Sequence, residues 1–172
     1  MPDKLDSAVY NEYAGQVYKY LLSLCHNPDT AEELTQETFY RAVKTIKNYD
    51  GSCKLYVWLC QIAKHVWYKE LESRKKNTQP LEDTLTDSGS DLENDAVLRF
   101  DKMELFKAMQ SLEPIQREVV YLRLTGEFSF KEIGDILDKD ETWARVTFYR
   151  AKQKLKSGMS PKDNTRKEQK NG

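Results

Sequence analysis

The stretch from Ser129 to Lys156 constrains the fold most, because it predicts two helices separated by a short polar turn. Ser129 and Glu132 have the spacing of a capping box, in which each side chain accepts the other residue's backbone N–H, so a helix begins here. The run 138–140 interrupts the apolar pattern, and Asp140 can cap a second helix. That second helix carries a narrow apolar stripe at helical spacing, made of Ala144, Phe148, Ala151 and Leu155. A short capped helix, a tight turn and a longer helix are typical of a helix-turn-helix.

The second of these helices also has a polar outer side, which favours DNA binding over a merely solvated surface. The residues on that side are Thr142, Arg145, Val146, Tyr149 and Arg150. From residue 145 to the end of the chain, nine Lys or Arg stand against two Asp or Glu, although the formal net charge of the whole chain is −1. Helical hairpins with a solvated charged face are common, but such a face does not require this segregation of charge. We therefore favour an interaction with a polyanion such as DNA.

The acidic residues are gathered in a different stretch, which predicts a tether between two domains. Residues 80–104 hold eight acidic and two basic side chains, and the first part of this stretch is rich in Pro, Gly and Ser. Apolar residues recur with helical period on both sides of it, and no strand pattern appears. We predict an all-α chain with small helical domains at 6–76 and 96–156, a flexible acidic linker at 77–95, and a polar tail at 157–172.

The amino-terminal domain is predicted to hold three helices, at about 9–25, 30–47 and 55–75. The middle helix begins with a capping box from Thr30 to Glu33. Its apolar side contains Leu34, Phe39, Ala42, Val43 and Ile46. Its polar side contains Glu32, Glu33, Gln36, Glu37 and Arg41. Solvation alone explains such a polar side more often than a partner does, so the residues by themselves leave its role open.

The third predicted helix becomes basic along its length, and this change favours single-stranded nucleic acid. Cationic side chains alternate there with aromatic ones: Lys64, His65, Trp67, Tyr68, Lys69 and Arg74. Exposed rings stack on unpaired bases, while cations follow the phosphates. The alternative is that Trp58 and Trp67 belong to the core, which we expect for at least one of them.

The remaining residues argue against an enzyme, a metalloprotein and a membrane protein. No apolar run approaches the ~20 residues of a membrane span, and the amino terminus lacks the charged-then-apolar pattern of a signal sequence. Cys25, Cys53 and Cys60 lack ligand or redox spacing, and the chain has two histidines. No P-loop, nucleophile elbow or cluster of carboxylates occurs. We predict a non-enzymatic cytoplasmic protein without cofactor or metal.

Two blocks of the sequence resemble the bacterial sigma factors of RNA polymerase. AEELTQETFYRAVK (31–44) and VWLCQIAKHVWYKEL (57–71) are similar to region 2, and LEPIQREVVYLRLTGEFSFKEIGDIL with FYRAKQKL is similar to region 4. The small size and the directly joined regions resemble the extracytoplasmic-function (ECF) group. The resemblance covers most of residues 9–156. It implies an alternative sigma factor that binds core RNA polymerase and directs promoter-specific transcription initiation.

The resemblance implies a role for each polar surface of the chain. Region 2 would bind the clamp of the polymerase's largest subunit through Glu32, Glu33, Gln36 and Glu37. It would read and melt the minus-10 element through Asn48, Tyr49, Asp50, Gly51, Ser52, Lys54, Lys64 and His65. Region 4 would bind the flap of the second-largest subunit, and would read the minus-35 element through Thr142, Arg145, Val146, Tyr149 and Arg150.

The chain departs from the family pattern in places that bear on promoter choice. His65 stands where the family has an Asn near the minus-10 strand, and Trp143 and Val146 replace the commoner small polar residues of the recognition helix. Thr30 to Glu33 replaces the usual Asp-Ala-Glu-Asp with most of its charge kept. The alternative function is a stand-alone helix-turn-helix regulator that binds duplex DNA without polymerase. An inhibitory anti-sigma partner is left open.

Overall fold

We obtained a computed structural model of the chain, which describes residues 5–77, 103–105 and 107–158. Every regular element among these residues is a helix, and no strand occurs in this part of the chain. The predicted all-α fold is therefore confirmed. The predicted linker at 77–95 and tail at 157–172 fall almost wholly outside the described residues.

The amino-terminal unit consists of α1 (Ser7–Cys25), α2 (Pro28–Thr45), a single 3-10 turn η1 (Ile46–Asn48) and α3 (Leu55–Lys76). Helix α2 begins two residues earlier than predicted, because Asn27 caps it by accepting the Thr30 N–H at 2.9 Å and Pro28 takes the first helical position. Proline suits that position, since its φ is already helical and its missing N–H would have no helical partner. The predicted capping box at Thr30 is thus wrong, because Thr30 already lies inside the first turn.

The carboxy-terminal unit consists of α5 (Pro114–Leu124), α6 (Phe130–Leu137) and α7 (Glu141–Gly158), with further helical residues at 103–105 and 107–110. The capping box at the start of α6 is confirmed. Glu132 N–H donates to Ser129 Oγ at 3.1 Å, and Ser129 N–H donates to Glu132 Oε2 at 2.8 Å. Asp140 accepts the Trp143 N–H at 2.6 Å, so it lies at the start of α7 as predicted. Helices α6 and α7 with their turn form the predicted helix-turn-helix.

The turn between α6 and α7 is tight, and it depends on a glycine. Asp138 has a left-handed φ of 55°, and the Lys139 N–H donates back to the Gly134 carbonyl oxygen at 2.9 Å. A Cβ at position 134 would lie 2.6 Å from the Lys139 carbonyl oxygen and 3.0 Å from Asp140. Only a residue without a side chain therefore allows the backbone after α6 to fold back this closely.

The apolar residues of α7 and α3 face the interior largely as predicted. On α7, Ala144 is fully buried, Leu155 is buried and Phe148 is half-buried. On α3, Trp67 is buried and Trp58 is half-buried. The prediction that at least one of these tryptophans belongs to the core is confirmed.

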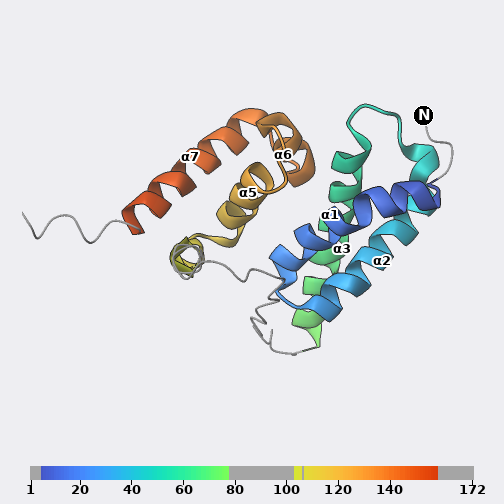
Figure 1. The fold of residues 1–172 in the computed structure, drawn as a ribbon, viewed down its shortest axis with the longest axis horizontal. Coiled ribbons are helices and arrows are strands. Elements are labelled where there is room, and N and C mark those ends of the chain that lie inside the picture. Colours follow the sequence, from blue (N-terminus) through green and yellow to red (C-terminus); the bar gives the residue numbers. More distant parts are fainter. Residues whose placement is uncertain (1–4, 78–102, 106, 159–172) are drawn as a thin grey trace, which may run out of the picture.

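The two units pack against each other (Figure 1), and their buried side chains share one apolar cluster. Helix α6 lies on α3, and α5 lies on α1. The Tyr56 ring of α3 stacks on Phe128, which precedes α6, with 4.8 Å between the ring centroids. Phe128 is only 3% exposed. The surface of the amino-terminal unit around the start of α3 is therefore covered by the carboxy-terminal unit.

Candidate nucleic-acid interface

The outer side of α7 presents the five side chains that the sequence assigns to base reading. All five are exposed: Thr142, Arg145, Val146, Tyr149 and Arg150. The guanidinium of Arg145 is held by Glu141, with 2.8 Å between Nη2 and Oε1, and it lies 5.5 Å from the centre of the Phe130 ring. The structure thus brings the predicted residues together on one exposed helix face with a positioned cation.

The loop between η1 and α3 is held by its own side chains. Asp50 accepts the Ser52 N–H at 2.9 Å, and hydrogen bonding to Ser52 lowers the pKa of the Asp50 carboxyl. Gly51 has a left-handed φ of 75° between them, which glycine adopts without strain. The Tyr49 hydroxyl donates to the Cys53 carbonyl oxygen, and its ring lies 5.2 Å from that of Trp58.

A hollow of about 290 Å³ lies beside this loop and opens between the two units. Asn48, Tyr49, Asp50, Ser52 and Cys53 line it from the loop side. Trp58 and Gln61 of α3 line it as well, and Lys131 and Asp135 of α6 contribute the remaining wall. The predicted minus-10 loop therefore borders a polar cavity, but one that a helix of the other unit shares.

The three basic side chains assigned to the minus-10 element differ sharply in exposure. The side chain of Lys54 is 79% exposed and that of His65 is 61% exposed. The side chain of Lys64 is only 3% exposed, because it is enclosed against α6 and donates to Asp138 Oδ2. This contact lowers the pKa of the Asp138 carboxyl. In this conformation Lys64 is not available to a DNA strand.

Burial also removes one of the two aromatic rings that the sequence predicts to be available to unpaired bases on the basic part of α3. Trp67 is buried, whereas Tyr68 is 39% exposed and Lys69 is exposed. Of the two rings, Tyr68 is therefore the one whose face an unpaired base could reach.

The polar side of α2 forms a second exposed surface, on the amino-terminal unit. Glu32, Glu33 and Gln36 are exposed, whereas Glu37 is half-buried and pairs with Arg41 at 2.6 Å. Two apolar residues, Tyr40 and Val43, lie on the same face and are 56% and 54% exposed.

These two apolar residues were missed by the sequence reasoning. The expected position of Val43 on the apolar side of α2 is wrong, because it points to solvent. The spacing of the sequence could have predicted their exposure. Tyr40 and Val43 follow Gln36 at i+4 and i+7, so they lie on the same helical face as Gln36. The apolar character of Val43 alone had suggested burial, and Tyr40 had been assigned to neither side.

A buried carboxyl group joins the two units. Glu118 of α5 is 5% exposed, and its oxygens accept the hydroxyls of Tyr20 at 2.6 Å and Tyr68 at 3.3 Å. Burial raises the pKa of Glu118, while these hydrogen bonds work in the opposite direction. Sequence reasoning missed this residue; its only signal is that position 118 shares a helix face with Ile115 and Leu122.

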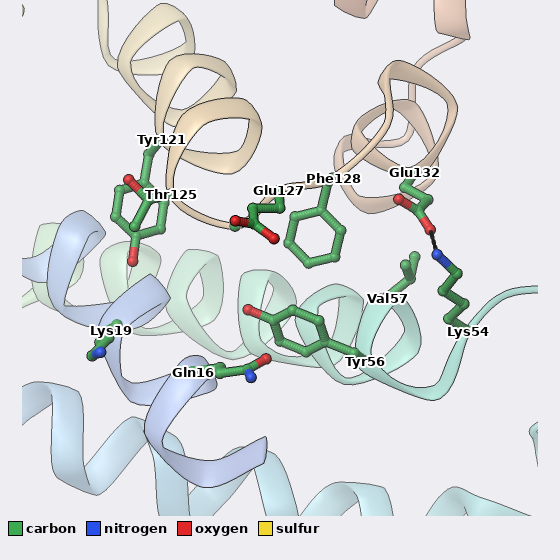
Figure 2. Close-up of a pocket in the computed structure, with 11 residues that line it drawn as sticks. Gln16, Lys19, Lys54, Tyr56, Val57, Tyr121, Thr125, Glu127, Phe128 and Glu132 are labelled. Carbon is green, nitrogen blue, oxygen red and sulfur yellow. Dashed lines mark ion pairs between the residues drawn. The ribbon is translucent and has the colours of Figure 1, made fainter. Parts of the chain in front are cut away.

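A further hollow of about 470 Å³ lies between the units, next to the stacked Tyr56 and Phe128 rings, and its lining residues are drawn in Figure 2. Gln16 and Lys19 of α1 line one side of it, and Glu127 lines the other. Across the described residues no group of three or more His, Cys, Asp or Glu could hold a metal ion. None of the described helices is long and apolar enough to cross a membrane.

Comparison with protein families gives a match for each unit. Residues 9–77 match Sigma-70 region 2, and residues 102–155 match Sigma-70, region 4. The chain is 31% identical over 153 residues to the ECF RNA polymerase sigma factor SigM of Bacillus subtilis, covering 87% of this chain and 91% of that protein. It is 28% identical over 156 residues to the RNA polymerase sigma factor YlaC of the same organism, covering 88% and 90%.

Two solved structures are similar in fold. The sigma factor RpoE of Bartonella quintana, solved in complex with the anti-sigma factor NepR, matches with a TM-score of 0.68 at 21% identity, over 87% of this chain and 93% of that one. CnrH, solved in complex with the cytosolic domain of CnrY, matches with a TM-score of 0.63 at 15% identity, over 87% and 84%. At these identities the likeness concerns the fold.

Proposed function

The chain belongs to the extracytoplasmic-function group of RNA polymerase sigma factors, and we propose that three separate polar surfaces divide the work of initiation among them. The protein binds core RNA polymerase and directs promoter-specific transcription. The proposed surfaces are the exposed side of α2 for polymerase, the loop at 48–54 with Lys64 and His65 of α3 for the minus-10 element, and the outer side of α7 for the minus-35 element. The observation that supports this division most is the exposed, cation-bearing face of α7. The carboxy-terminal unit would also bind the polymerase flap.

The α2 surface suits a protein partner better than DNA, because its charge is negative. Glu32 and Glu33 would face a basic surface on the polymerase clamp and steer the approach of the two proteins. Tyr40 and Val43 would supply buried apolar contact, since aromatic side chains are frequent at the centres of protein interfaces. Glu37, which is paired with Arg41, would contribute less than Glu32 and Glu33.

The loop at 48–54 suits an extruded base, because its backbone turn is fixed before DNA arrives. The Asp50–Ser52 hydrogen bond and the left-handed Gly51 hold the loop around the neighbouring hollow. A flipped base offers its hydrogen-bonding edge to such a pocket, and unpairing it consumes a few kcal/mol that these contacts must offset.

His65→Asn should change the preferred base at one minus-10 position and leave minus-35 preference unchanged. His65 is exposed on α3, one helical turn beyond Gln61, which lines the hollow next to the loop, and an Asn side chain offers a different donor and acceptor pattern to a base edge. We expect a change in preference of roughly 10-fold, within the ~1–3 kcal/mol that such a contact contributes. Transcription in vitro from randomised minus-10 libraries measures it. Lys69→Asn, one helical turn further on, is the control and should weaken all promoters alike; equal profiles for both variants would make His65 a structural residue.

Arg145→Ala should relax base preference at one minus-35 position. Its guanidinium, held by Glu141, lies near the amino-terminal end of α7, which a helix-turn-helix inserts into the major groove. A bidentate contact with guanine contributes about 1–3 kcal/mol of discrimination. Lys152→Ala, further along the exposed side, should instead weaken all sequences and reduce the salt-dependence slope by about 0.9, because one phosphate would no longer be neutralised. Binding titrations of minus-35 duplex libraries at several salt concentrations separate the two. A uniform loss of affinity for both variants would make Arg145 a backbone contact.

The function as a whole is tested by transcription in vitro on a genomic DNA library, with purified core polymerase and with or without this protein. We expect new, sequence-specific start sites only when both are present. Tight sequence-specific binding to duplex DNA without polymerase, together with no new start sites, would instead support the stand-alone regulator. We also propose that the protein acts in the cytoplasm without catalytic chemistry of its own, and that an anti-sigma factor binds it as NepR binds the solved RpoE.

A further inference from the structure

The first residue of α6, Phe130, places its ring against the outer side of α7. The ring is half-buried, and two guanidinium groups lie over it. Cζ of Arg145 lies 5.5 Å from the ring centre, and Cζ of Arg123 lies 4.5 Å from it. Both distances are within the ~6 Å over which an aromatic face attracts a cation. One ring of α6 thus joins a side chain of α5 to one of α7.

Contacts on the α5 side hold this ring in place. Arg123 Nη1 donates to the Phe128 carbonyl oxygen at 2.9 Å, so its guanidinium is tied to the backbone two residues before Phe130. The Phe130 ring also packs against that of Phe148, with 5.6 Å between the centroids, a separation at which aromatic pairs attract each other. The ring of Phe130 therefore has a defined position before DNA arrives.

On the α7 side, the same ring meets two of the side chains proposed to read bases. Arg145 and Tyr149 are spaced i and i+4, so they lie on one face of the helix. The Tyr149 ring centroid is 6.3 Å from that of Phe130. The side chain of Arg145 is 49% exposed and Tyr149 is 52% exposed. Both are thus supported from beneath by Phe130 while remaining accessible to a base edge.

The support matters most for Arg145, because a long side chain loses conformational entropy when it binds. Its guanidinium is restrained by the Phe130 ring and by Glu141, whose Oε1 lies 2.8 Å from Nη2. These contacts leave donors on the other guanidinium nitrogens for O6 and N7 of a guanine. A side chain that is already ordered gives up less freedom on binding, so more of the contact energy is available for discrimination.

We propose that Phe130 is a positioning residue of the minus-35 site. Its ring, braced by Arg123, orients Arg145 and Tyr149 and so contributes to base preference through them. The inference rests on the proposed assignment of the outer side of α7 to the minus-35 element. It places part of the sequence specificity in the first helix of the helix-turn-helix, as the rigid support that a recognition site needs.

Three substitutions of Phe130 and one control separate positioning from packing. Phe130→Leu keeps an apolar side chain but removes the aromatic face, whereas Phe130→Tyr keeps that face. Phe130→Met fills a similar volume without a ring, because methionine adapts to irregular space. Phe148→Leu is the matched control: it removes a ring from the same aromatic group, but this ring packs against the apolar clusters of the interior.

Transcription in vitro from promoters with randomised minus-35 elements tests the proposal, with core polymerase and the full-length chain. Arg145→Ala is the reference and should relax preference at one position by roughly 10-fold. Phe130→Leu should relax the same position by about two- to five-fold, the range of a cation–π contact at an exposed site. Phe130→Tyr should keep the unaltered profile. Phe148→Leu should lower the midpoint of thermal unfolding and leave the base preference unchanged.

A double variant shows whether the ring acts through Arg145. Because the two residues are in contact, their effects should not add. Phe130→Leu combined with Arg145→Ala should relax that position no further than Arg145→Ala alone. A fully additive loss would mean that Phe130 acts independently of Arg145, which would overturn the proposal.

The remaining outcomes distinguish the inference from the function on which it rests. If Arg145→Ala relaxes its position but Phe130→Leu does not, Phe130 has no positioning role and the proposed function stands. An equal loss at all sequences for Phe130→Leu and Phe148→Leu would make Phe130 a packing residue only. If circular dichroism shows that Phe130→Leu does not fold, Phe130→Met is held to the same expectation. Unchanged preference in Arg145→Ala would overturn the proposed base reading, and this inference with it.

Discussion

Glu33→Lys combined with Gln36→Lys should abolish binding to core RNA polymerase. Both side chains are exposed on the outer face of α2, so the substitutions leave the core of the amino-terminal unit unchanged. Like charges brought together at an interface cost several kcal/mol, and a loss of about 100-fold or more in affinity is expected. Co-purification of the variant with polymerase, and competition with the unaltered protein for core, measure the loss.

The charge reversal needs a control that shares its chemistry. Glu72→Lys is exposed near the end of α3 and lies outside the proposed polymerase surface. It should leave polymerase binding intact, and circular dichroism should show the same helix content for both variants. Tyr40→Ala should weaken binding without any change of charge, because it removes an exposed ring from the same face. Undiminished co-purification of the double lysine variant would show that polymerase binds elsewhere.

Gly134→Ala should destabilise the carboxy-terminal unit and abolish minus-35 recognition. The added Cβ would lie 2.6 Å from the Lys139 carbonyl oxygen, and this neighbour is backbone, which cannot rotate away as a side chain can. Overpacking of this kind typically lowers the free energy of unfolding by about 1–3 kcal/mol. The turn would have to widen, and α7 would change its angle relative to α6. Thermal unfolding and binding to a minus-35 duplex measure the two consequences.

Gly15→Ala provides the matched control for this substitution. Position 15 lies inside α1, and an added Cβ would meet nothing within 4 Å. Alanine loses less conformational freedom than glycine in a helix, so we expect a gain of about 0.5–1 kcal/mol in unfolding free energy. If Gly134→Ala instead unfolded and bound DNA like Gly15→Ala, the turn between α6 and α7 would have room for a side chain in solution.

The parts of the fold that follow from neighbouring residues could be predicted from the sequence. The capping box of Ser129 and Glu132 and the cap at Asp140 each depend on residues three positions apart, and both are confirmed. The start of α2 was misassigned because two competing caps, Asn27 and Thr30, lie within one turn of each other. Pro28 follows Asn27 and takes the first helical position, so the helix begins there and Asn27 is the cap.

The parts that depend on distant residues could not be predicted in this way. Tyr20 and Glu118 are separated by 98 positions, and no local pattern connects them. The sequence predicts Lys64 to be an exposed cation, because nothing near it in the sequence indicates that it is buried and paired with Asp138. Val43 was predicted to lie in the core, since apolar character alone does not distinguish a buried position from an exposed one. The candidate surfaces could thus be located by spacing and resemblance, but the covering of one surface by α6 could not.

The two contacts made by one carboxylate have separate consequences. Glu132 gives one oxygen to the Ser129 N–H at the start of α6 and the other to Lys54 across the interface. A change from glutamate to glutamine at this position keeps the first contact and removes the ion pair. A single conservative exchange at this position can therefore alter how tightly the two units hold together, while the cap that starts α6 stays as it was.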